Sequence, residues 1–324
     1  MIKTGIIGGS GYTGGELIRI LLNHPAVEID FVYSTTRAGK KVTTTHPDLL
    51  GTTDLEFTGN VNLNVNVVFL CLGHGNSTAF LKEHSFSTDT IIIDLSNDFR
   101  LLADANFNGK QFVYGLPELN KSDIENAKNI ANPGCFATAI QLALLPLAKA
   151  NFLENEVHIN AVTGSTGAGV SPSATSHFSW RNNNVSWYKP FTHQHLGEIN
   201  ESLHSLQENT GNLFFMPNRG NFTRGILATS YTKFDGDLSE ANALYQDFYK
   251  DAVFTQISDE PINLKQVVNT NQCHVHLHKH DDLLLVTSAI DNLLKGASGQ
   301  AVQNMNLILG LEENLGLNLK AGVF

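Results

Sequence analysis

The first fifteen residues, MIKTGIIGGSGYTGG, constrain the fold of this chain more than any other segment. An apolar strand over Lys3–Gly8 leads directly into a glycine-rich turn, and Gly14–Asn23 then carries its apolar residues at helical spacing. Glycines stand at every third position through the turn, at Gly8, Gly11 and Gly14. A strand, a tight glycine turn and an amphipathic helix in this order predict the first unit of a parallel β-α-β fold.

Strand and helix patterns continue to alternate through the first hundred residues. Val27–Tyr33 and Thr90–Asp94 are predicted as strands, and Thr78–His84 as a helix. Val65–Leu72 is predicted as a strand buried on both faces, because its apolar run is continuous. This alternation is typical of a doubly wound parallel sheet, so we expect an α/β chain that begins with a Rossmann-like domain.

The pattern changes near residue 145. Val157–Thr163 is predicted as a strand, and a stretch rich in Gly, Ser, Asn and Thr follows at 164–190. The strands predicted at Gly225–Phe234 and Cys273–His280 alternate apolar and polar residues, as in an antiparallel sheet open on one face. Leu293–Leu311 is predicted as a helix. At 324 residues two domains are expected, the second an α+β domain with a largely antiparallel sheet.

The composition excludes several classes of partner. A formal net charge of −10 argues against nucleic acid, because phosphate contacts need a basic surface. No apolar run approaches the roughly 20 residues of a membrane span. The chain reaches its glycines too early for a signal peptide, and its sparse cysteines fit a reducing compartment. We therefore expect a cytoplasmic protein that contacts no nucleic acid and no membrane.

The glycine loop has the arrangement of a dinucleotide-binding turn. Its glycines allow close approach of backbone to a pyrophosphate, and the helix N-terminus supplies N–H donors. The next strand ends in YSTTRAGKK, without the carboxylate that would bind the ribose of NAD. Ser34, Thr36 and Arg37 instead suit a 2′-phosphate, so the cofactor is predicted to be NADP (NADPH) rather than NAD. Gly73, in the CLGHG segment at the end of the third long strand, is predicted to allow close approach of this cofactor.

Cys135 follows Pro-Gly and precedes a long apolar run in NPGCFATA. Pro133 and Gly134 interrupt the preceding chain, so Cys135 is predicted to stand at or next to a helix N-terminus, where unpaired N–H groups lower the pKa of a thiol. A small packed residue is the alternative. The neighbourhood of a nucleotide turn favours a nucleophile, whereas Cys71 lies within a strand and is predicted to pack in the core.

A nucleophilic thiol needs a partner that accepts or donates protons. FTHQHLGEIN supplies His193 and His195, followed by Glu198. Metal binding by the two histidines lacks a third ligand, so no metal is expected. A second row of histidines, at 274, 276, 278 and 280, lies on one face of a predicted strand, and we interpret it as an exposed or interface surface.

Eight segments spread over nearly the whole chain together resemble one enzyme family. They are GGSGYTGGEL, DLSNDFRL, YGLPELN, NPGCFATA, TGSTGAG, HQHLGEI, RGILAT and IDNLLKGASGQAVQNMNLILG. The family that they resemble is that of the N-acetyl-gamma-glutamyl-phosphate reductases. The resemblance implies NADPH-dependent reduction of a small anionic acyl phosphate to a semialdehyde in arginine biosynthesis, through a cysteine thioester.

The resemblance also implies roles for individual residues. Cys135 matches the catalytic cysteine and His193 the proposed base, with His195 and Glu198 in supporting positions. The positions that match cofactor-binding residues are Ser10, Gly11, Tyr12, Thr13, the segment Ser34–Arg37 and, near the nicotinamide, Asn306. The implied domains are an NADP-binding domain over 1–134, completed by a C-terminal helix at 295–324, and a catalytic and dimerisation domain over 135–294. A homodimer or homotetramer is expected.

Three further residues are candidates for contacts with the substrate. Arg100 and Arg224 could bind its carboxylate or phosphate, since a guanidinium contacts either in a bidentate manner. The alternative for both is a structural ion pair. Ser165 belongs to the glycine-rich TGSTGAG loop, which could line the site or only form a tight turn.

Other functions remain open at this level. The same chemistry could act on an N-succinyl or carrier-linked glutamyl phosphate, although a carrier would need a basic docking face that this acidic chain does not offer. Aspartate-semialdehyde dehydrogenase shares the chemistry, but HQHLGEI and YGLPELN speak against it. A non-catalytic NADP-binding regulator would not need Cys135 or His193.

Overall fold

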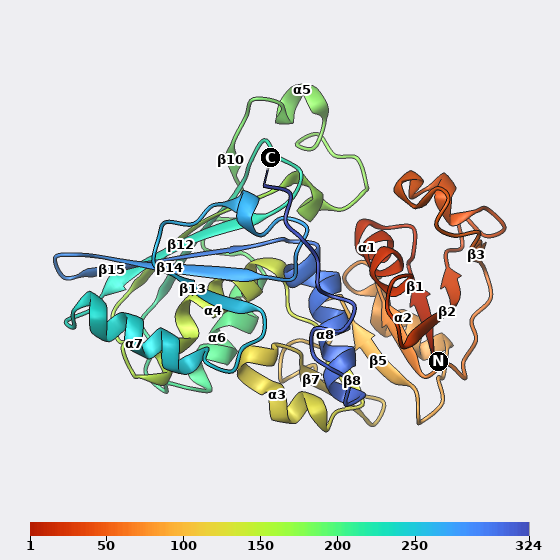
Figure 1. Cartoon of the computed structure of the whole chain (residues 1–324), viewed down its shortest axis with the longest axis horizontal. Coiled ribbons are helices and arrows are strands. Elements are labelled where there is room, and N and C mark those ends of the chain that lie inside the picture. The colour runs from red at the N-terminus through yellow and green to blue at the C-terminus, as the bar shows by residue number, and fades with distance from the viewer. Residues whose placement is uncertain (324) are drawn as a thin grey trace. The chain divides into compact units, whose positions relative to one another are not determined.

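A computed structural model describes residues 1–323 as two compact units (Figure 1). The first unit comprises residues 1–134 and 297–318, and the second comprises residues 135–296 and the described residues from 319 onward. The chain therefore leaves the first unit once and returns to it. As a division into functional domains, 1–134 with 295–324 and 135–294 stay a prediction, and residue 324 lies outside the described residues.

The first unit consists of a sheet and four α-helices. Its elements are β1 (Ile2–Ile7), α1 (Tyr12–Leu21), β2 (Val27–Tyr33), β3 (Phe57–Thr58), β4 (Val67–Leu70), α2 (Asn76–Glu83), β5 (Ile91–Asp94), β6 (Asn106–Phe107), β7 (Lys110–Tyr114), α3 (Pro117–Glu125), β8 (Asn129–Ala131) and α8 (Gly299–Ile308). Short 3₁₀ turns lie at Val42–Thr44 and Pro47–Leu49.

The sheet of the first unit has the order β3-β2-β1-β4-β5-β8-β7-β6, and all neighbouring strands except β6 and β7 run parallel. Its central strands β4 and β5 are buried along their whole length, which explains their continuous apolar sequences. The strand order reverses direction after β3, as in a doubly wound sheet. The predicted Rossmann-like class is confirmed.

The second unit contains a second sheet and its own helices. Its elements are α4 (Cys135–Lys149), β9 (Val157–Thr163), α5 (Phe178–Arg181), β10 (Ser186–Trp187), α6 (His195–His204), β11 (Leu213–Arg219), β12 (Ile226–Lys233), α7 (Leu238–Phe248), β13 (Thr255–Ser258), β14 (Cys273–His280) and β15 (Leu283–Ile290). The 3₁₀ turns are Ser165–Ala168 and Leu264–Gln266.

The sheet of the second unit has the order β10-β11-β9-β12-β15-β14-β13. Four neighbouring pairs are antiparallel, while β9–β11 and β13–β14 are parallel. The largely antiparallel sheet predicted for this part is therefore confirmed. Figure 1 shows α4, α6 and α7 together beside the sheet, and α4 packs on β12 and β15.

Helix α4 is buried on all sides from Phe136 to Ala148, so it is the central element of this unit. It contains Pro146, which has no N–H to donate to the carbonyl of Leu142 one turn earlier. The hydroxyl of Tyr249 donates to that carbonyl at 2.7 Å, and the hydroxyl of Tyr245 donates to the carbonyl of Ala143. Two tyrosines thus supply donors where the proline interrupts the helical ladder.

The helix predicted over Leu293–Leu311 is shorter and is divided. A π-helical turn at Leu294–Ser298 precedes α8, which ends at Ile308. The π turn surrounds Gly296, whose backbone packs directly on Cys135. Sequence periodicity shows only that the segment is helical. It does not show the π-helical turn, which lies where Gly296 packs on Cys135.

Several predicted strand boundaries are confirmed, among them β2, β9 and β14. Helix α1 begins at Tyr12, two residues earlier than predicted. In the described part of the chain, none of the helices combines the length and the apolar character that a membrane span requires.

Candidate active site

The glycine loop of the first unit is a turn that other residues cannot form. Gly8 has a φ of +81°, and a Cβ there would lie 2.6 Å from the carbonyl oxygen of Cys71. A Cβ on Gly14 would lie 2.6 Å from Cα of Gly9, so the start of α1 rests directly on the turn. A Cβ on Gly11 would meet its first neighbour only at 3.7 Å. Gly8 and Gly14 therefore shape the turn, while Gly11 leaves its outer side open.

The N-terminus of α1 is suited to an anion. Gly11 caps it without a side-chain hydrogen bond, and the first turn carries no acidic residue. Thr13 continues this turn, and its carbonyl accepts a hydrogen bond from the hydroxyl of Ser298. Tyr12 is 43 % exposed beside it. Backbone N–H groups at such an end are the usual ligands of a pyrophosphate.

The end of β2 carries hydroxyls and a cation. The hydroxyl of Ser34 donates to the hydroxyl of Ser10 in the glycine loop at 3.2 Å, which brings these two predicted cofactor residues together. Thr36 and Arg37 are exposed in the turn that follows. The open turn, the uncapped helix end and a basic, carboxylate-free strand end together fit NADP.

The loop between β4 and α2 contains Gly73 and is braced by a carboxylate from the next loop. Asp98 accepts hydrogen bonds from the N–H groups of Gly75 at 2.6 Å and Thr78 at 2.9 Å. Although burial opposes the effect, these bonds lower the pKa of Asp98 below its ordinary value. Asp98 therefore caps the N-terminus of α2, although it lies about 20 residues further along the chain. It also holds the loop with Gly73, which we expect to face the cofactor.

Cys135 is the first residue of α4, as predicted, and the other two cysteines have different surroundings. Burial raises the pKa of the Cys71 thiol to about 12, which excludes a reactive thiolate there. Cys273 is fully buried in β14. Cys135 is half-buried, and a Cβ on Gly296 would lie 2.8 Å from its own Cβ. The positions of its Cα and Cβ are thus defined by the helix start and by a glycine contact.

His193 and His195 lie beside the residue that follows Cys135. The ring of Phe136 is 5.5 Å from that of His193 and 6.4 Å from that of His195, and both histidines are buried. Helix α6 is tied to α4 by Gln141, whose amide donates to the carbonyl of Glu198 at 3.0 Å. The two predicted histidines therefore contact the residue next to Cys135, within the same unit.

The backbone determines which nitrogen of His193 carries a proton. Nδ1 of His193 accepts the N–H of His195 at 3.2 Å, which requires a lone pair on that nitrogen. The neutral ring consequently carries its proton on Nε2. Nε2 of His195 lies 3.9 Å from Oε1 of Glu198, one turn further along α6, and both side chains are buried. A supporting role of Glu198 toward His195 stays a prediction, with which this contact is compatible.

Two residues near this group were not found by sequence reasoning. The ring of Tyr188 lies 5.8 Å from that of His193, and the guanidinium of Arg219 lies over the Tyr188 ring at 4.6 Å. Burial, and then the neighbouring charge of Cys135, raise the pKa of Tyr188 to about 12, against the influence of Arg219. Tyr188 and Arg219 are far apart in the sequence and share no motif. The pairing of β10 with β11 brings them together.

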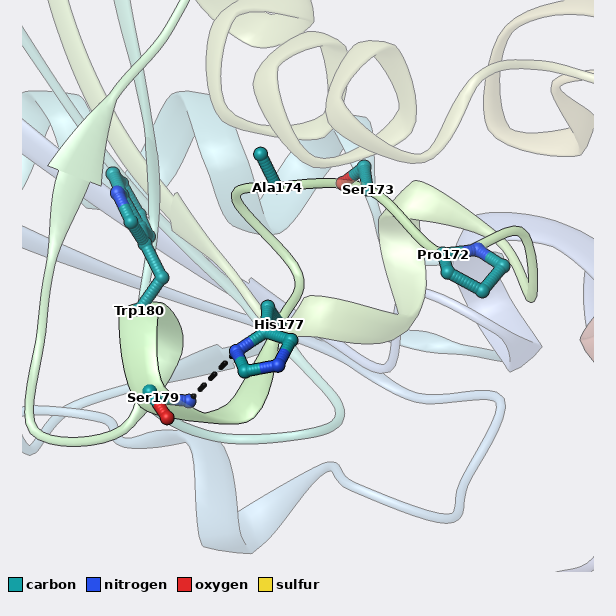
Figure 2. A pocket seen from close by; sticks show the side chains of 6 residues that line it. All are labelled: Pro172, Ser173, Ala174, His177, Ser179 and Trp180. Carbon is teal, nitrogen blue, oxygen red and sulfur yellow. Dashed lines mark hydrogen bonds between the residues drawn. The ribbon is translucent and has the colours of Figure 1, made fainter.

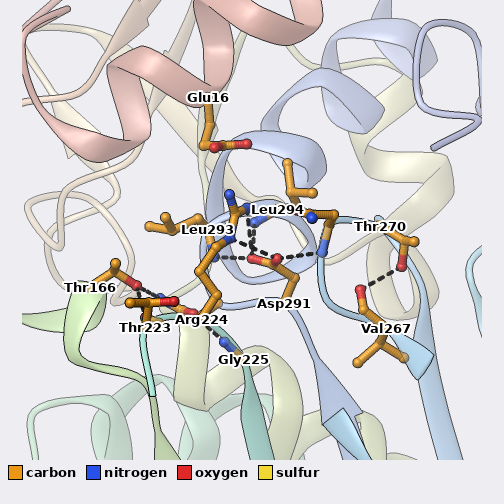
Figure 3. A network of polar contacts seen from close by, with 12 residues as sticks. Glu16, Thr166, Thr223, Arg224, Gly225, Val267, Thr270, Asp291, Leu293 and Leu294 are labelled. Carbon is orange, nitrogen blue, oxygen red and sulfur yellow. Dashed lines mark hydrogen bonds and ion pairs between the residues drawn. The ribbon is translucent and has the colours of Figure 1, made fainter. Parts of the chain in front are cut away.

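The two arginines predicted to bind substrate are held by protein groups. Arg100 is buried, and it donates to the carbonyls of Asn132 at 2.9 Å and Leu95 at 3.0 Å. Arg224 forms a two-pronged ion pair with the fully buried Asp291, with N···O distances of 3.0 and 3.1 Å (Figure 3). These contacts correspond to the alternative of a structural role, and a substrate contact at either arginine stays a prediction.

Ser165 and Asn306 are also held by local structure. Ser165 begins a 3₁₀ turn, and its N–H donates to the carbonyl of Phe222. Asn306 is fully buried in the first unit, where its oxygen contacts His24 and its amide donates to two carbonyls of the following segment. Asn306 thus anchors that segment, and its predicted approach to the nicotinamide stays a prediction.

Two other features contain none of these cysteine and histidine residues. Figure 2 shows a surface pocket of about 650 Å³ in the 164–190 segment, lined by Pro172, Ser173, Ala174, His177, Ser179 and Trp180. None of these was predicted as a site residue. The histidines of β14 alternate with buried residues, and burial lowers the pKa of His274. Among residues 1–323, no group of three or more His, Cys, Asp or Glu residues has metal-binding geometry.

Comparisons with known proteins cover the whole chain. A family described as "Semialdehyde dehydrogenase, NAD binding domain" matches residues 3–127, and one described as "Semialdehyde dehydrogenase, dimerisation domain" matches residues 135–292. The second match begins at Cys135. These matches agree with the two sheets and with a nucleotide-binding turn at the N-terminus.

Full-length relatives narrow the family further. Proteins named N-acetyl-gamma-glutamyl-phosphate reductase from Flavobacterium johnsoniae and Christiangramia forsetii are 64 % and 62 % identical to this chain, over 100 % of both chains in each case. One from Parabacteroides distasonis is 56 % identical over the same full coverage.

Solved structures share the fold at low identity. An aspartate semialdehyde dehydrogenase II from Vibrio cholerae has a TM-score of 0.71 at 16 % identity and covers 96 % of this chain and 99 % of its own. An aspartate semialdehyde dehydrogenase with NADP from Candida albicans has a TM-score of 0.70 at 14 % identity, with 96 % and 99 % coverage. From the full-length relatives and both matched domains, the chain belongs to the N-acetyl-gamma-glutamyl-phosphate reductase family of semialdehyde dehydrogenases.

Proposed function

We propose that this chain reduces N-acetyl-gamma-glutamyl phosphate to N-acetyl-glutamate semialdehyde and phosphate with NADPH, as a step of arginine biosynthesis. The observation that carries the proposal is the position of Cys135 at the start of α4, where the next residue, Phe136, contacts the buried His193. The choice of substrate rests on the names of the full-length relatives. A homodimer in the cytoplasm accords with the matched dimerisation domain and with the sparse cysteines.

The thiol of Cys135 acts as the nucleophile in this proposal. Its thiolate attacks the γ-carbonyl carbon of the acyl phosphate, a C–S bond forms, and phosphate leaves with the electrons of the broken C–O bond. When bound, NADPH supplies a hydride to the thioester carbon. The C–S bond then breaks, the sulfur regains its electron pair, and the aldehyde is released. The proton consumed overall ends on phosphate.

The N-terminus of α4 is suited to stabilise first the thiolate and then the oxyanion of the reaction. Backbone N–H groups of its first turn lie at the positive end of the helix dipole, so they stabilise the thiolate before attack. The same donors suit the oxyanion that develops on the carbonyl oxygen. Helix α4 is buried along its length, so these donors are fixed before the substrate arrives.

His193 is placed to donate a hydrogen bond from Nε2. Because Nδ1 accepts the N–H of His195, the neutral ring carries its proton on Nε2, which can donate to a thiolate or an oxyanion. To accept a proton from the thiol at Nε2, the ring would first have to give up that backbone bond. His195 and Glu198 act through His193 and are positioning residues.

The proposal is tested by turnover in the reverse direction. Purified chain is mixed with phosphate, NADP and either N-acetyl- or N-succinyl-glutamate semialdehyde, and NADPH formation is followed by absorbance. We expect turnover with the N-acetyl substrate, its loss in Cys135→Ser, and unchanged NADP affinity in that variant by fluorescence titration. Full activity of Cys135→Ser would sink the cysteine mechanism. A wild-type chain that binds NADP but converts neither aldehyde would contradict the function.

A further inference from the structure

Arg219 stands at the end of β11, the strand next to the short edge strand β10. It is the last residue of β11 and is directly opposite Ser186 of β10 and Thr163 of β9 in the sheet register. Strands β9 and β11 run parallel, so the TGSTGAG loop and Arg219 lie at the same carboxyl edge. Phe215 lies on the same face of β11, since alternate residues of a strand share a face, and its ring contacts those of Phe136 and His193.

The guanidinium of Arg219 has no acidic partner. In the described part of the chain, none of the ion pairs involves Arg219, and its neighbour Arg181 uses its side chain on carbonyl groups and on Ser186. The charge of Arg219 contributes to lowering the pKa of Arg181, after burial. Two cations therefore stand close together without a carboxylate between them.

One donor of Arg219 is also unused. Its Nε is buried and makes no hydrogen bond among residues 1–323. Leaving a buried N–H of a charged group without a hydrogen bond costs free energy. Such a group therefore usually has a partner in the functional state. The planar fork of a guanidinium fits the two oxygens of a carboxylate or a phosphate.

Tyr188 connects this cation with the reacting group. Its ring carries the Arg219 guanidinium on one side and contacts His193 at 5.8 Å, and its hydroxyl is within electrostatic range of Cys135. All four residues belong to the second unit. The guanidinium groups of Arg100, Arg181 and Arg224 are used on carbonyls, on Ser186 or on Asp291, whereas Nε of Arg219 has no hydrogen-bond partner in the described chain.

We propose that Arg219, supported by the ring of Tyr188, binds an anionic group of the substrate and thereby presents the γ-carbonyl to Cys135. The inference rests on the proposed function and extends it to a residue that none of the motifs contains. The shared chemistry is that of a carboxylate or a phosphoryl group. The substrate carries both, so the experiment has an arm for each.

The test compares Arg219→Gln and Arg219→Lys with wild type in the reverse reaction. The KM for N-acetyl-glutamate semialdehyde, the KM for inorganic phosphate and the KM for NADP are measured separately. We expect Arg219→Gln to raise one of the first two at least tenfold and to leave that of NADP unchanged. A rise for the aldehyde identifies the carboxylate arm, and a rise for phosphate identifies the phosphoryl arm. Arg219→Lys should recover part of the loss, because it keeps the charge without the fork.

The matched control is Lys233→Gln, which removes an exposed cation of β12 in the same unit and should change none of the three constants. If Arg219→Gln melts more than 10 °C below wild type, Arg219→Lys alone decides, with an expected rise of at least threefold in one KM. Unchanged KM values for aldehyde and phosphate in a folded variant of an active enzyme overturn the inference. An inactive wild type instead contradicts the proposed function.

Discussion

The backbone of Gly296 lies against Cys135 so closely that a Cβ at position 296 would be 2.8 Å from the Cβ of Cys135 and 3.2 Å from its Cα. The glycine belongs to the π-helical turn Leu294–Ser298, which follows the last strand of the second sheet. π-helical turns occur frequently at functional sites. Here the turn places a residue without a side chain against the proposed nucleophile. No space for a further atom is left between Gly296 and the Cα and Cβ atoms of Cys135.

Gly296→Ala should displace Cys135 and impair the chemical step. Neither the buried start of α4 nor the π turn has space for a methyl group at 2.8 Å, so one of them must shift. We expect kcat to fall at least about tenfold, since a small misplacement of a reacting group is costly. Steady-state kinetics and the rate of Cys135 alkylation measure the effect. Gly59→Ala is the control, because its Cβ would make only an ordinary contact at 3.6 Å. Wild-type kinetics in Gly296→Ala would contradict the packing argument.

Tyr249→Phe should destabilise the second unit. The substitution leaves the carbonyl of Leu142 without a partner, because Pro146 has no N–H to offer it. We expect a loss of about 1–2 kcal/mol in the free energy of unfolding, measured with urea. Tyr231→Phe removes a hydroxyl from a 42 % exposed tyrosine and should change stability little. Equal stabilities of the two variants would show that the hydroxyl of Tyr249 does not compensate for the proline.

Asp94 should make the stability of the first unit depend on pH. Burial raises its pKa from 3.8 to about 6, even though the hydroxyls of Ser77 and Ser96 donate to its oxygens. The folded state therefore binds this proton more tightly than the unfolded state does. The resulting stabilisation is fully present below pH 3.8 and is lost as pH rises through 6, a change of about 3 kcal/mol at 1.36 kcal/mol per pKa unit.

The comparison of wild type with Asp94→Asn isolates this group, because all other carboxylates titrate in both proteins. Asparagine cannot accept both hydroxyls equally well, so the variant has a constant cost at every pH. The difference in the free energy of unfolding between the two proteins, measured with urea from pH 4 to pH 8, should change until about pH 6 and then level off. A difference that stays constant over this range would rule out a raised pKa at Asp94.

Asp98→Ala should weaken cofactor binding more than turnover. The carboxylate holds the N–H groups of Gly75 and Thr78, and a helix cap of this kind contributes about 1 kcal/mol. Without it, the loop that contains Gly73 loses its brace, and we expect the KM for NADP to rise about fivefold, an effect of about 1 kcal/mol. Asp89→Ala, at a carboxylate whose side chain is 91 % exposed, is the control. A larger effect on kcat than on KM would assign Asp98 a different role.

Local signals were sufficient for much of the site. The glycine spacing placed the nucleotide turn, and Pro133-Gly134 placed Cys135 at a helix start, because both depend on backbone conformations within a few residues. That His193 lies near Cys135 could not be predicted from such local signals, and this expectation came from the family resemblance. In the structure the contact is made by Phe136, which directly follows the cysteine.

The site predictions that stay open concern residues whose partners lie far along the chain. Arg224 is paired with Asp291, 67 residues away, and Arg100 donates to Asn132, 32 residues away. A sequence shows that an arginine is present, but not whether a buried carboxylate or carbonyl already holds it. For the same reason Arg219 and Tyr188 were missed, since only the pairing of a two-residue strand with β11 brings them together.

The return of residues 297–318 to the first unit has a consequence for synthesis. While the ribosome is still making the second sheet, the first unit lacks α8, whose Asn304 donates to the carbonyl of Gly115 and whose Asn306 contacts His24. The N-terminal part of the nascent chain must therefore wait for its final helix until almost the whole protein has emerged. A truncation that removes residues 297–318 would take the last helix from the nucleotide-binding unit, although that unit begins at residue 1.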